Sequence, residues 1–274
     1  MKKKENFTDK EKAYLKRVSS TYTMAGSEYS RIKREFAIRS YRPFIQSDAY
    51  GAPKGSILQL GCADGLETQL LLGLGASIDV IDGSDIFITE CKKNYHEKVR
   101  YIHTLFEEYT LSDSQKKYDY VFASWVLEHV FDVQTILTMI KRVLNPFGMV
   151  FVTVPNAKAA SRQLALHMNL IPHLKDLTEN DKNHGHRRVY DRFSINTDLE
   201  NGGFEIVAQG GIIFKLLADF QLDQLLTDGF LTREHMEGLY QLGLEYPDFC
   251  DSLYTVCRIK QSRHSPHGTD TILK

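Results

Sequence analysis

Ile57-Leu-Gln-Leu-Gly-Cys-Ala-Asp-Gly65 is a short apolar strand that runs directly into a turn of small residues. A helix-like stretch follows at 66–74, and the next apolar run, 78–81, is closed by Asp82. An α/β sheet presents a nucleoside cofactor at the carboxyl ends of its strands, and the elements that do so follow in the order strand, glycine turn, helix, strand and acid. The stretch therefore predicts an α/β fold with a cofactor site at one sheet edge.

The spacing of small residues in the turn discriminates between two nucleoside cofactors. A dinucleotide-binding turn reads G-x-G-x-x-G, and here it would need glycine at position 63 and glycine or alanine at position 66. The chain has Ala63 and Leu66, and a leucine at that third position obstructs close packing of helix on strand. The last glycine is Gly65 instead. NAD is therefore disfavoured, and an NAD-dependent oxidoreductase is kept only as an alternative.

The spacing Gly61-x-Ala63-x-Gly65 resembles motif I of the class I S-adenosylmethionine-dependent methyltransferases. Small residues let backbone N–H groups approach a ligand, and the N-terminus of the following helix suits a carboxylate or a phosphate. Members usually carry an acid two residues before the first glycine, where this chain has Gln59. Asp82 matches the ribose-binding acid of the family, because its two carboxylate oxygens can accept from two vicinal hydroxyls.

The alternation of strands and helices continues along the chain. Further strands are expected at 99–102, 118–123, 149–154, 204–208 and 253–259. The clearest helix can be capped by Asp132 and is stopped by Asn145-Pro-Phe-Gly148. Later helices are expected at 194–201, 215–226 and 233–244, after a long, irregular, histidine-rich stretch at 156–190.

The resemblance extends over 56–259, because further motifs follow in the family's order: Tyr118-Asp-Tyr-Val-Phe-Ala-Ser124, Leu127-Glu-His129 and Leu144-Asn-Pro-Phe-Gly148. It implies a Rossmann-like, seven-stranded, mostly parallel sheet with an antiparallel last strand, helices on both faces and helical lid insertions. His184-Gly-His-Arg187 also resembles a bacterial subgroup of the family to which no substrate is attached. The expected division is a helical cap at 1–50, a methyltransferase domain at 51–260 with lid insertions at 156–190 and 210–250, and a disordered tail at 261–274.

Composition and charge narrow the classes of binding partner that are expected for this chain. The chain has 274 residues, a net charge of −1 and a pI near 6.8, without the basic footprint of a nucleic-acid-binding protein. Its four cysteines have neither metal-ligand nor C-x-x-C spacing, which predicts reduced thiols in a cytoplasmic protein. No apolar run is long enough to span a membrane, and Met1-Lys-Lys-Lys4 lacks the apolar segment of a signal peptide. We expect a monomer or homodimer that binds neither nucleic acid nor membrane.

The resemblance implies S-adenosylmethionine as cofactor and S-adenosylhomocysteine as product. It places Gly61, Ala63 and Gly65 at the methionine end, Phe106 and Glu107 at the adenine, and Ser124 and Trp125 at the sulfonium. The full set of expected cofactor residues is Gln59, Gly61, Ala63, Gly65, Asp82, Gly83, Phe106, Glu107, Ser124 and Trp125.

Methyl transfer needs donor and acceptor held in line, water excluded and, for some acceptors, a base. The candidate catalytic residues are His129, His184, His186 and Tyr190. Histidine suits proton transfer near neutral pH, although a structural role for His129 is the stronger interpretation. Arg187, Tyr22 and Tyr29 are the candidate acceptor contacts, and Arg187 and Arg188 could hold an anionic group.

Metal chemistry is not expected from the sequence. The magnesium-binding Asp-Asn pair of the catechol-type members has no counterpart at 124–129, and a histidine-pair site at His184 and His186 is the weaker interpretation. The sequence therefore predicts metal-independent methyl transfer to an oxygen or nitrogen of a small-molecule acceptor, an anionic one included. A non-catalytic S-adenosylmethionine-binding protein is the other alternative. A nucleic-acid amine methylase is disfavoured, because Ser124-Trp-Val-Leu127 lacks the Pro-Pro-aromatic motif.

Overall fold

The computed structural model describes residues 2–21, 27–47, 55–74, 77–94, 98–110 and 117–261, with the side chains of all except 2–7, 20 and 21. The expected acceptor contact Tyr22 and positions 262–274 of the expected tail lie outside these residues. Within the described ranges, no helix has the length and apolar character needed to cross a membrane.

The centre of the fold is a seven-stranded sheet in the order β3-β2-β1-β4-β5-β7-β6. Strands β1 to β5 are parallel to their neighbours among themselves, whereas β7 is antiparallel to both β5 and β6. The predicted sheet with its antiparallel last strand is confirmed. The strands are β1 (Ile57–Leu60), β2 (Ile78–Asp82), β3 (Val99–His103), β4 (Tyr118–Ser124), β5 (Leu144–Pro155), β6 (Phe204–Gly211) and β7 (Ser252–Ile259).

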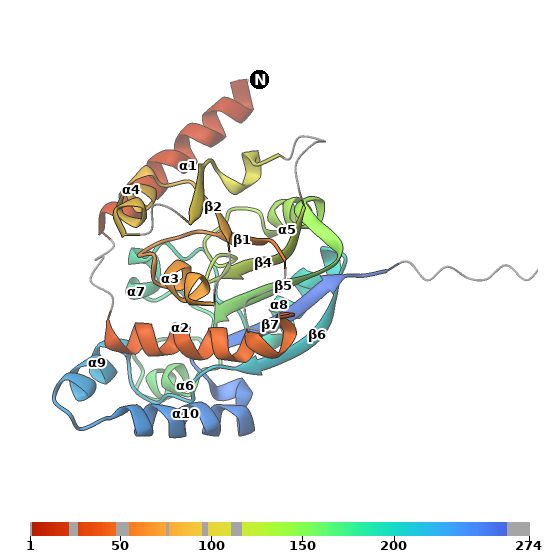
Figure 1. Ribbon diagram of the computed structural model, residues 1–274. Helices are drawn as coiled ribbons and strands as arrows, with labels where there is room; N and C mark the ends of the chain where they lie inside the picture. The colour runs from red at the N-terminus through yellow and green to blue at the C-terminus, as the bar shows by residue number, and fades with distance from the viewer. Residues whose placement is uncertain are drawn as a thin grey trace, which may run out of the picture.

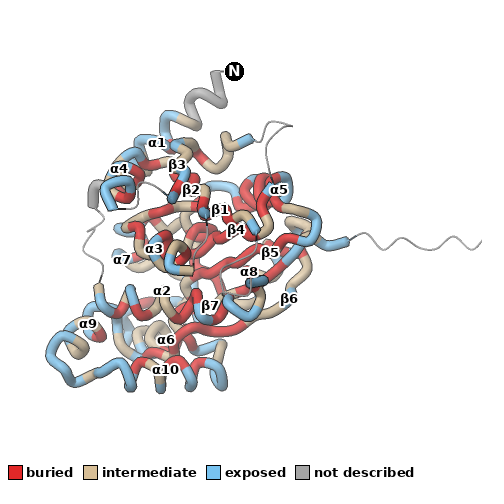
Figure 2. The backbone as a smooth tube through the Cα atoms, in the orientation of Figure 1, coloured by how far each residue is buried: buried red, intermediate tan, exposed pale blue. Residues whose placement is uncertain are grey.

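Helices cover both faces of this sheet (Figure 1). Alternate residues of β4 face opposite ways, so that Phe122 packs with α2, α3, α4 and α10, and Val121 packs with α5 and α8. Buried residues concentrate along the central strands (Figure 2). The helices are α1 (Lys2–Thr21), α2 (Glu28–Tyr41), α3 (Leu66–Gly73), α4 (Asp85–Asn94), α5 (Val133–Val143), α6 (Ala160–His167), α7 (Glu179–Asn183), α8 (Arg192–Asn201), α9 (Asp219–Thr227) and α10 (Arg233–Glu245), with 3₁₀ turns at Arg42–Phe44, Phe106–Glu108 and Pro247–Phe249.

Helix α2 is part of the core. Its Tyr41 is fully buried, with its ring centroid 4.8 Å from that of Phe151 in β5. Its Phe36 lies 4.6 Å from Tyr240 of α10, again between ring centroids. Helix α2, which lies within the expected cap at 1–50, therefore packs directly on the sheet of the expected methyltransferase domain.

The start of α9 differs from the expected helix at 215–226. The helix begins at Asp219, because the preceding residues are held extended against the chain that leads into β7. Phe214 forms an isolated bridge with Cys250, and the buried ammonium of Lys215 lies 2.5 Å from Asp251 Oδ1. A helix at 215 would break both contacts.

The segment 156–190 is more ordered than its sequence predicts. It contains α6 and the short helix α7, which begins with a capping box between Thr178 and Asp181. The Arg162 guanidinium of α6 lies 3.1 Å from Asp181, so the two helices are tied together. Strand β5 is also longer than the expected 149–154, because Leu144 already pairs with Tyr118.

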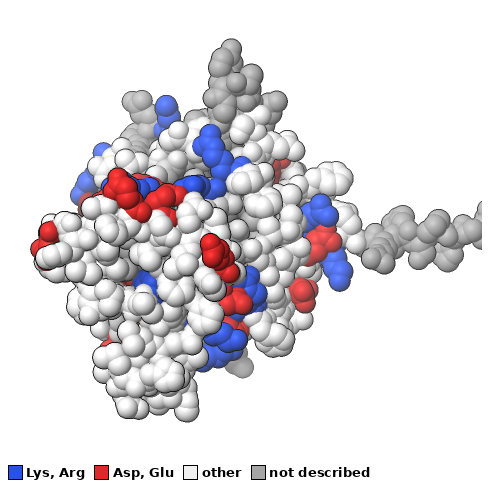
Figure 3. Space-filling view, turned by 90° about the horizontal axis from the view of Figure 1, so that it is seen from below, with Lys and Arg blue, Asp and Glu red and all other residues white. Residues whose placement is uncertain are grey.

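The face seen from below carries acidic and basic side chains beside one another (Figure 3). Helices α9 and α10 lie at this side of the molecule (Figure 1). Between α2 and α10, Arg39 pairs with Glu237 at 2.7 Å and Arg233 pairs with Glu35 at 2.6 Å. Such interspersed charge agrees with the near-zero net charge and does not make a basic surface for nucleic acid on this face.

The cap of α5 provides a test of the fold. Asp132 accepts from the backbone N–H of Gln134 and from the hydroxyl of Thr135. Asp132→Ala should lower the free energy of unfolding by about 1 kcal/mol, because it leaves a helix N–H without its acceptor. Asp132→Ser, which keeps a capping oxygen, should retain most of the stability. Urea unfolding followed by circular dichroism measures both, and equal stabilities of the two variants would contradict the capping role.

Candidate functional site

The turn after β1 and the acid after β2 face each other at the carboxyl edge of the sheet. Gly61, Ala63 and Gly65 all have left-handed backbones, with φ of 76°, 42° and 79°. The backbone N–H of Cys62 donates to Asp82 Oδ2 at 2.8 Å, so the buried Asp82 carboxylate is aimed at the turn. The structure thus brings together the expected methionine-end and ribose-end groups.

A buried polar network lies beneath the turn, between β1, α3 and β4. The Gln59 amide donates to Gly61 O at 2.9 Å and to Glu67 Oε2 at 3.3 Å, while the Thr68 hydroxyl donates to Gln59. Among the described residues, Glu67 Oε1 and the hydroxyl oxygen of Ser124 have no hydrogen-bond partner. Burial raises the pKa of Glu67 to about 7, against the opposing influence of Ser124 and Arg34. Both atoms are buried, and the Ser124 hydroxyl lies close enough to the Glu67 carboxyl to oppose the rise of its pKa.

Trp125 turns the chain away at the end of β4. It has a φ of 53°, an uncommon conformation that concentrates at functional sites. Its backbone N–H donates to Thr153 O at 2.7 Å and its indole N–H to Ser252 at 3.3 Å. Lys33 Nζ and the Arg34 guanidinium, both from α2, lie 5.7 and 5.8 Å from the ring centroid. The tryptophan expected at the sulfonium therefore already interacts with two protein cations.

Helix α1 extends over the carboxyl ends of β2 and β3. A Cβ atom at Gly83 would come within 2.6 Å of Leu15 Cδ1, so the Leu15 side chain of α1 packs closely on the chain after Asp82. The expected adenine contacts lie close by in the 3₁₀ turn Phe106–Glu108. Phe106 packs against the α5-side core, and burial raises the pKa of Glu107.

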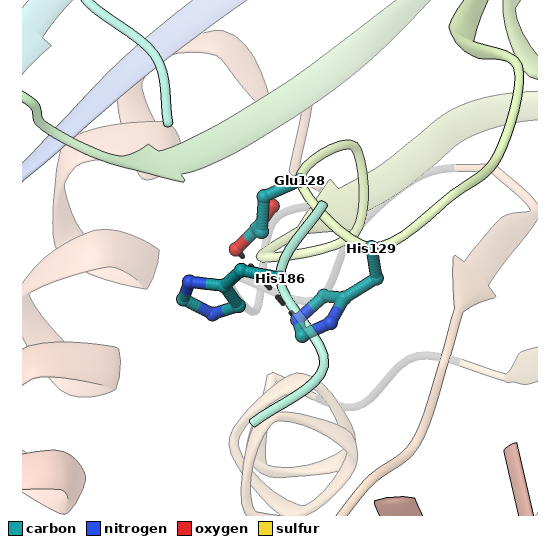
Figure 4. Close-up of side chains that lie close together, drawn as sticks. All are labelled: Glu128, His129 and His186. Carbon is teal, nitrogen blue, oxygen red and sulfur yellow. Dashed lines mark ion pairs between the residues drawn. The ribbon is translucent and has the colours of Figure 1, made fainter. Parts of the chain in front are cut away.

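A carboxylate and two imidazoles meet beside this edge (Figure 4). Glu128, His129 and His186 each contribute one donor atom, and these atoms all lie within 4.8 Å of one another. Glu128 is fully buried, and among the described residues neither of its oxygens has a hydrogen-bond partner. Burial raises its pKa to about 7, whereas burial and the neighbouring His186 lower the pKa of His129 to about 3. His129 is therefore neutral at pH 7.

The remaining expected residues lie away from this cluster. His184 is exposed, with its Nδ1 2.8 Å from Asn180 O and its ring centroid 6.4 Å from that of His186. Tyr190 is buried and donates to Asp198 of α8, so it anchors a helix and does not orient a base. Tyr29 is fully buried in the core beside Lys33, not exposed to an acceptor.

The two arginines expected at an anionic acceptor are engaged by the protein itself. Arg187 pairs with Glu11 of α1 at 2.8 Å and donates to His129 O. Arg188 donates to the carbonyls of Leu127 and Val130, both at 2.6 Å. Both guanidinium groups therefore fix the loop that carries Glu128 and His129.

Sequence reasoning missed several residues that the structure places at the site. Glu67 and Arg34 lie beside the turn, and Lys33 and Asp251 form a partly buried ion pair at 3.1 Å near Trp125. Glu128 was visible only as the middle of Leu127-Glu-His129, with nothing in the pattern to say that it would meet His186.

Comparisons with known proteins agree with this geometry. A family model described as a methyltransferase domain matches residues 30–209. The human mitochondrial ubiquinone biosynthesis O-methyltransferase is 35% identical over 116 residues, which are 40% of this chain and 31% of that protein. The ubiquinone biosynthesis O-methyltransferase of Rhizobium etli is 28% identical over 169 residues, 60% of this chain and 65% of that protein. The chain thus spans about a third to two thirds of these relatives.

Solved structures share the fold at low sequence identity. The CcbJ methyltransferase of Streptomyces caelestis superposes with a TM-score of 0.56 at 14% identity, over 90% of this chain and 98% of that chain. The N-methyltransferase NodS of Bradyrhizobium japonicum, in complex with S-adenosylhomocysteine, has a TM-score of 0.53 at 13% identity, over 87% and 91%.

The buried carboxyl of Glu67 predicts a pH-dependent stability. Because its folded pKa of about 7 exceeds its ordinary value of 4.5, its stabilising contribution is complete below about pH 4.5 and is lost as the pH rises through 7. Glu67→Gln cannot ionise, so its unfolding free energy relative to wild type should rise over that range, by about 1–3 kcal/mol at pH 8. Urea unfolding at pH 5 and pH 8 measures the difference. The exposed Glu179→Gln should show no comparable gain, and a pH-independent effect at Glu67 would contradict the raised pKa.

Proposed function

The chain belongs to the methyltransferase domain family, and from this premise we propose that it transfers a methyl group from S-adenosylmethionine to an oxygen of a small-molecule acceptor. The observation that carries the proposal is the left-handed Gly61 turn with the Asp82 carboxylate aimed into it. Oxygen is preferred to nitrogen because the curated relatives are named O-methyltransferases. An NAD-dependent oxidoreductase has no support among these relatives.

We assign the ribose to Asp82. Its two carboxylate oxygens each accept one backbone N–H, from Cys62 and Ser84, both at 2.8 Å. The Cys62 thiol also lies 3.4 Å from Oδ2, and because a carboxylate has about four acceptor sites it retains capacity for a hydroxyl group. The backbone donors thereby orient the group and leave it competent to bind a ribose hydroxyl.

We assign the methionine end to the Gly61 turn and to Glu67. Gln59 stands where family members usually carry an acid, and its side-chain amide donates to Gly61 O and to Glu67. The unpartnered oxygens of Glu67 and Ser124 fit an ammonium group, which has three N–H donors. In this proposal the negative charge that Gln59 lacks is supplied by Glu67 from the first turn of α3.

The acceptor end lies beyond Trp125, at Glu128, His129 and His186. S-adenosylmethionine, when bound, supplies a methyl group already activated by the positive sulfur. The chain's own task is to hold the acceptor oxygen in line with that methyl group, to exclude water and to remove the hydroxyl proton. Glu128 is buried one residue before His129, and His186 is partly exposed. In this proposal these side chains lie close together and can take up the hydroxyl proton.

The cofactor assignment predicts a selective loss of affinity. Asp82→Ala should weaken binding of S-adenosylhomocysteine by about 1–3 kcal/mol, because a buried ribose hydroxyl loses its acceptor. Asp79→Ala, in the same strand but paired with Arg100, should leave that affinity unchanged. Calorimetry with the purified chain measures both, and NADH should not bind. Unchanged affinity in Asp82→Ala would remove Asp82 from the site.

The assignment of Glu67 has its own test. Glu67→Gln should weaken S-adenosylmethionine by about 1.5–3 kcal/mol, the usual worth of a hydrogen bond to a charged group. It should leave 5′-methylthioadenosine unaffected, because this nucleoside lacks the amino-acid moiety. Competition binding of the two ligands gives the comparison. Equal losses for both would place Glu67 away from the methionine end.

A further inference from the structure

The cluster of Glu128, His129 and His186 has the features of a site built to be filled. Glu128 has no exposed surface, and among the described residues both of its oxygens lack a hydrogen-bond partner. Leaving a buried carboxylate without partners is costly. His129 Nε2 lies 3.9 Å from Glu128 Oε1, a contact that Figure 4 marks with a dashed line and that is longer than a hydrogen bond. Glu128 therefore lies beside the two histidines without a hydrogen bond to either of them.

Each of the two histidines has one ring nitrogen engaged by a partner outside the cluster. His186 Nδ1 lies 3.0 Å from Asp181 Oδ1, and His129 Nδ1 lies 3.2 Å from Gly185 O. A carboxylate and a carbonyl only accept, so each Nδ1 carries a hydrogen in these contacts. Metal-ligating histidines almost always donate their other ring N–H to a carboxylate or to a backbone carbonyl.

These outer partners are themselves held. The Asp181 carboxylate accepts from the backbone N–H and hydroxyl of Thr178 and pairs with Arg162 at 3.1 Å. The Gly185 carbonyl also accepts from the Tyr14 hydroxyl of α1. Both imidazoles are therefore fixed in orientation before any ligand arrives, as a preorganised site requires.

We propose that Glu128, His129 and His186 form a binding site for a divalent transition-metal ion, with zinc as the preferred ion. Two imidazoles and one carboxylate are the ligand set of open zinc sites, which keep a further position for water or substrate. Magnesium is a poorer match, because it prefers oxygen ligands. The site differs from the histidine pair considered from the sequence, because Glu128 and His129 take the place of His184.

The role of the ion rests on the proposed methyl transfer, although the site itself does not. An acceptor hydroxyl that coordinates the ion loses its proton to water more readily, because the ion stabilises the oxyanion. The oxyanion then forms the O–CH₃ bond as the S–CH₃ bond breaks, and the electron pair of that bond returns to sulfur. This arrangement removes the need for His186 to act as a base and reverses the expectation of metal independence.

Metal binding is tested on the full chain without reference to turnover. Zinc affinity is measured by competition with a chromophoric chelator, and cobalt(II) absorption reports the ligand set. Glu128→Gln and His186→Ala should each weaken zinc by about 10²-fold or more, because loss of an outer-shell partner alone costs 10–100-fold. His184→Ala is the matched control, and it should bind zinc as wild type does. Equal zinc affinity in wild type and His186→Ala would overturn the proposal.

Two further measurements separate this proposal from the proposed function. S-adenosylhomocysteine affinity, measured on the same samples, should be unchanged in Glu128→Gln, which shows that the fold and the cofactor site persist. With a hydroxyl acceptor, chelator treatment should abolish S-adenosylhomocysteine formation, and zinc should restore it. Full activity after chelation would overturn the metal's role and return His186 to the part of base, with methyl transfer itself intact.

Discussion

Parallel pairing of β1 with β2 and β4 is the constraint on which the site depends. It brings the carboxyl ends of three strands to one edge, so that the Gly61 turn, Asp82 and Ser124 become neighbours although the chain separates them. Left-handed backbones at Gly61 and Trp125 then turn the chain sharply at that edge. In a regular strand or helix the backbone N–H and C=O groups bond to one another, whereas these turns leave such groups free to face a ligand.

Buried charge distinguishes the structural contacts from the ligand-facing ones. Lys33 and Lys215 both pair with Asp251, so this partly buried carboxylate is compensated and joins α2 to the start of β7. Glu67 and Glu128 are buried more deeply but retain unpartnered oxygens. Uncompensated burial reduces stability, and groups of this kind cluster where function requires them. The contrast locates the two ends of the proposed reaction.

The histidine-bearing segment owes its position to arginines and to α1. Arg188 holds the loop after β4 through its carbonyls, and Arg187 joins the same loop to Glu11. Tyr14 of α1 donates to the carbonyl of Gly185, which also faces His129. Residues that look like anion ligands in the sequence are thus the ties that hold His129 and His186 together, and α1 covers the edge that they complete.

The sequence by itself determined the elements whose signal is local. Apolar periodicity located β2 and β7 closely, Asp132 marked the start of α5, and the small-residue turn with Asp82 identified the cofactor end. Only the tertiary structure brought Glu128 and His186 together, because they lie on separate loops and their meeting depends on contacts that no local pattern contains. Contacts between distant residues also explain why Glu67 lies beside Gln59, why Tyr190 faces α8 and why α9 begins only at Asp219. Hydrophobic periodicity is a property of neighbours along the chain, whereas the orientation of a polar side chain is set by partners that the fold brings from elsewhere.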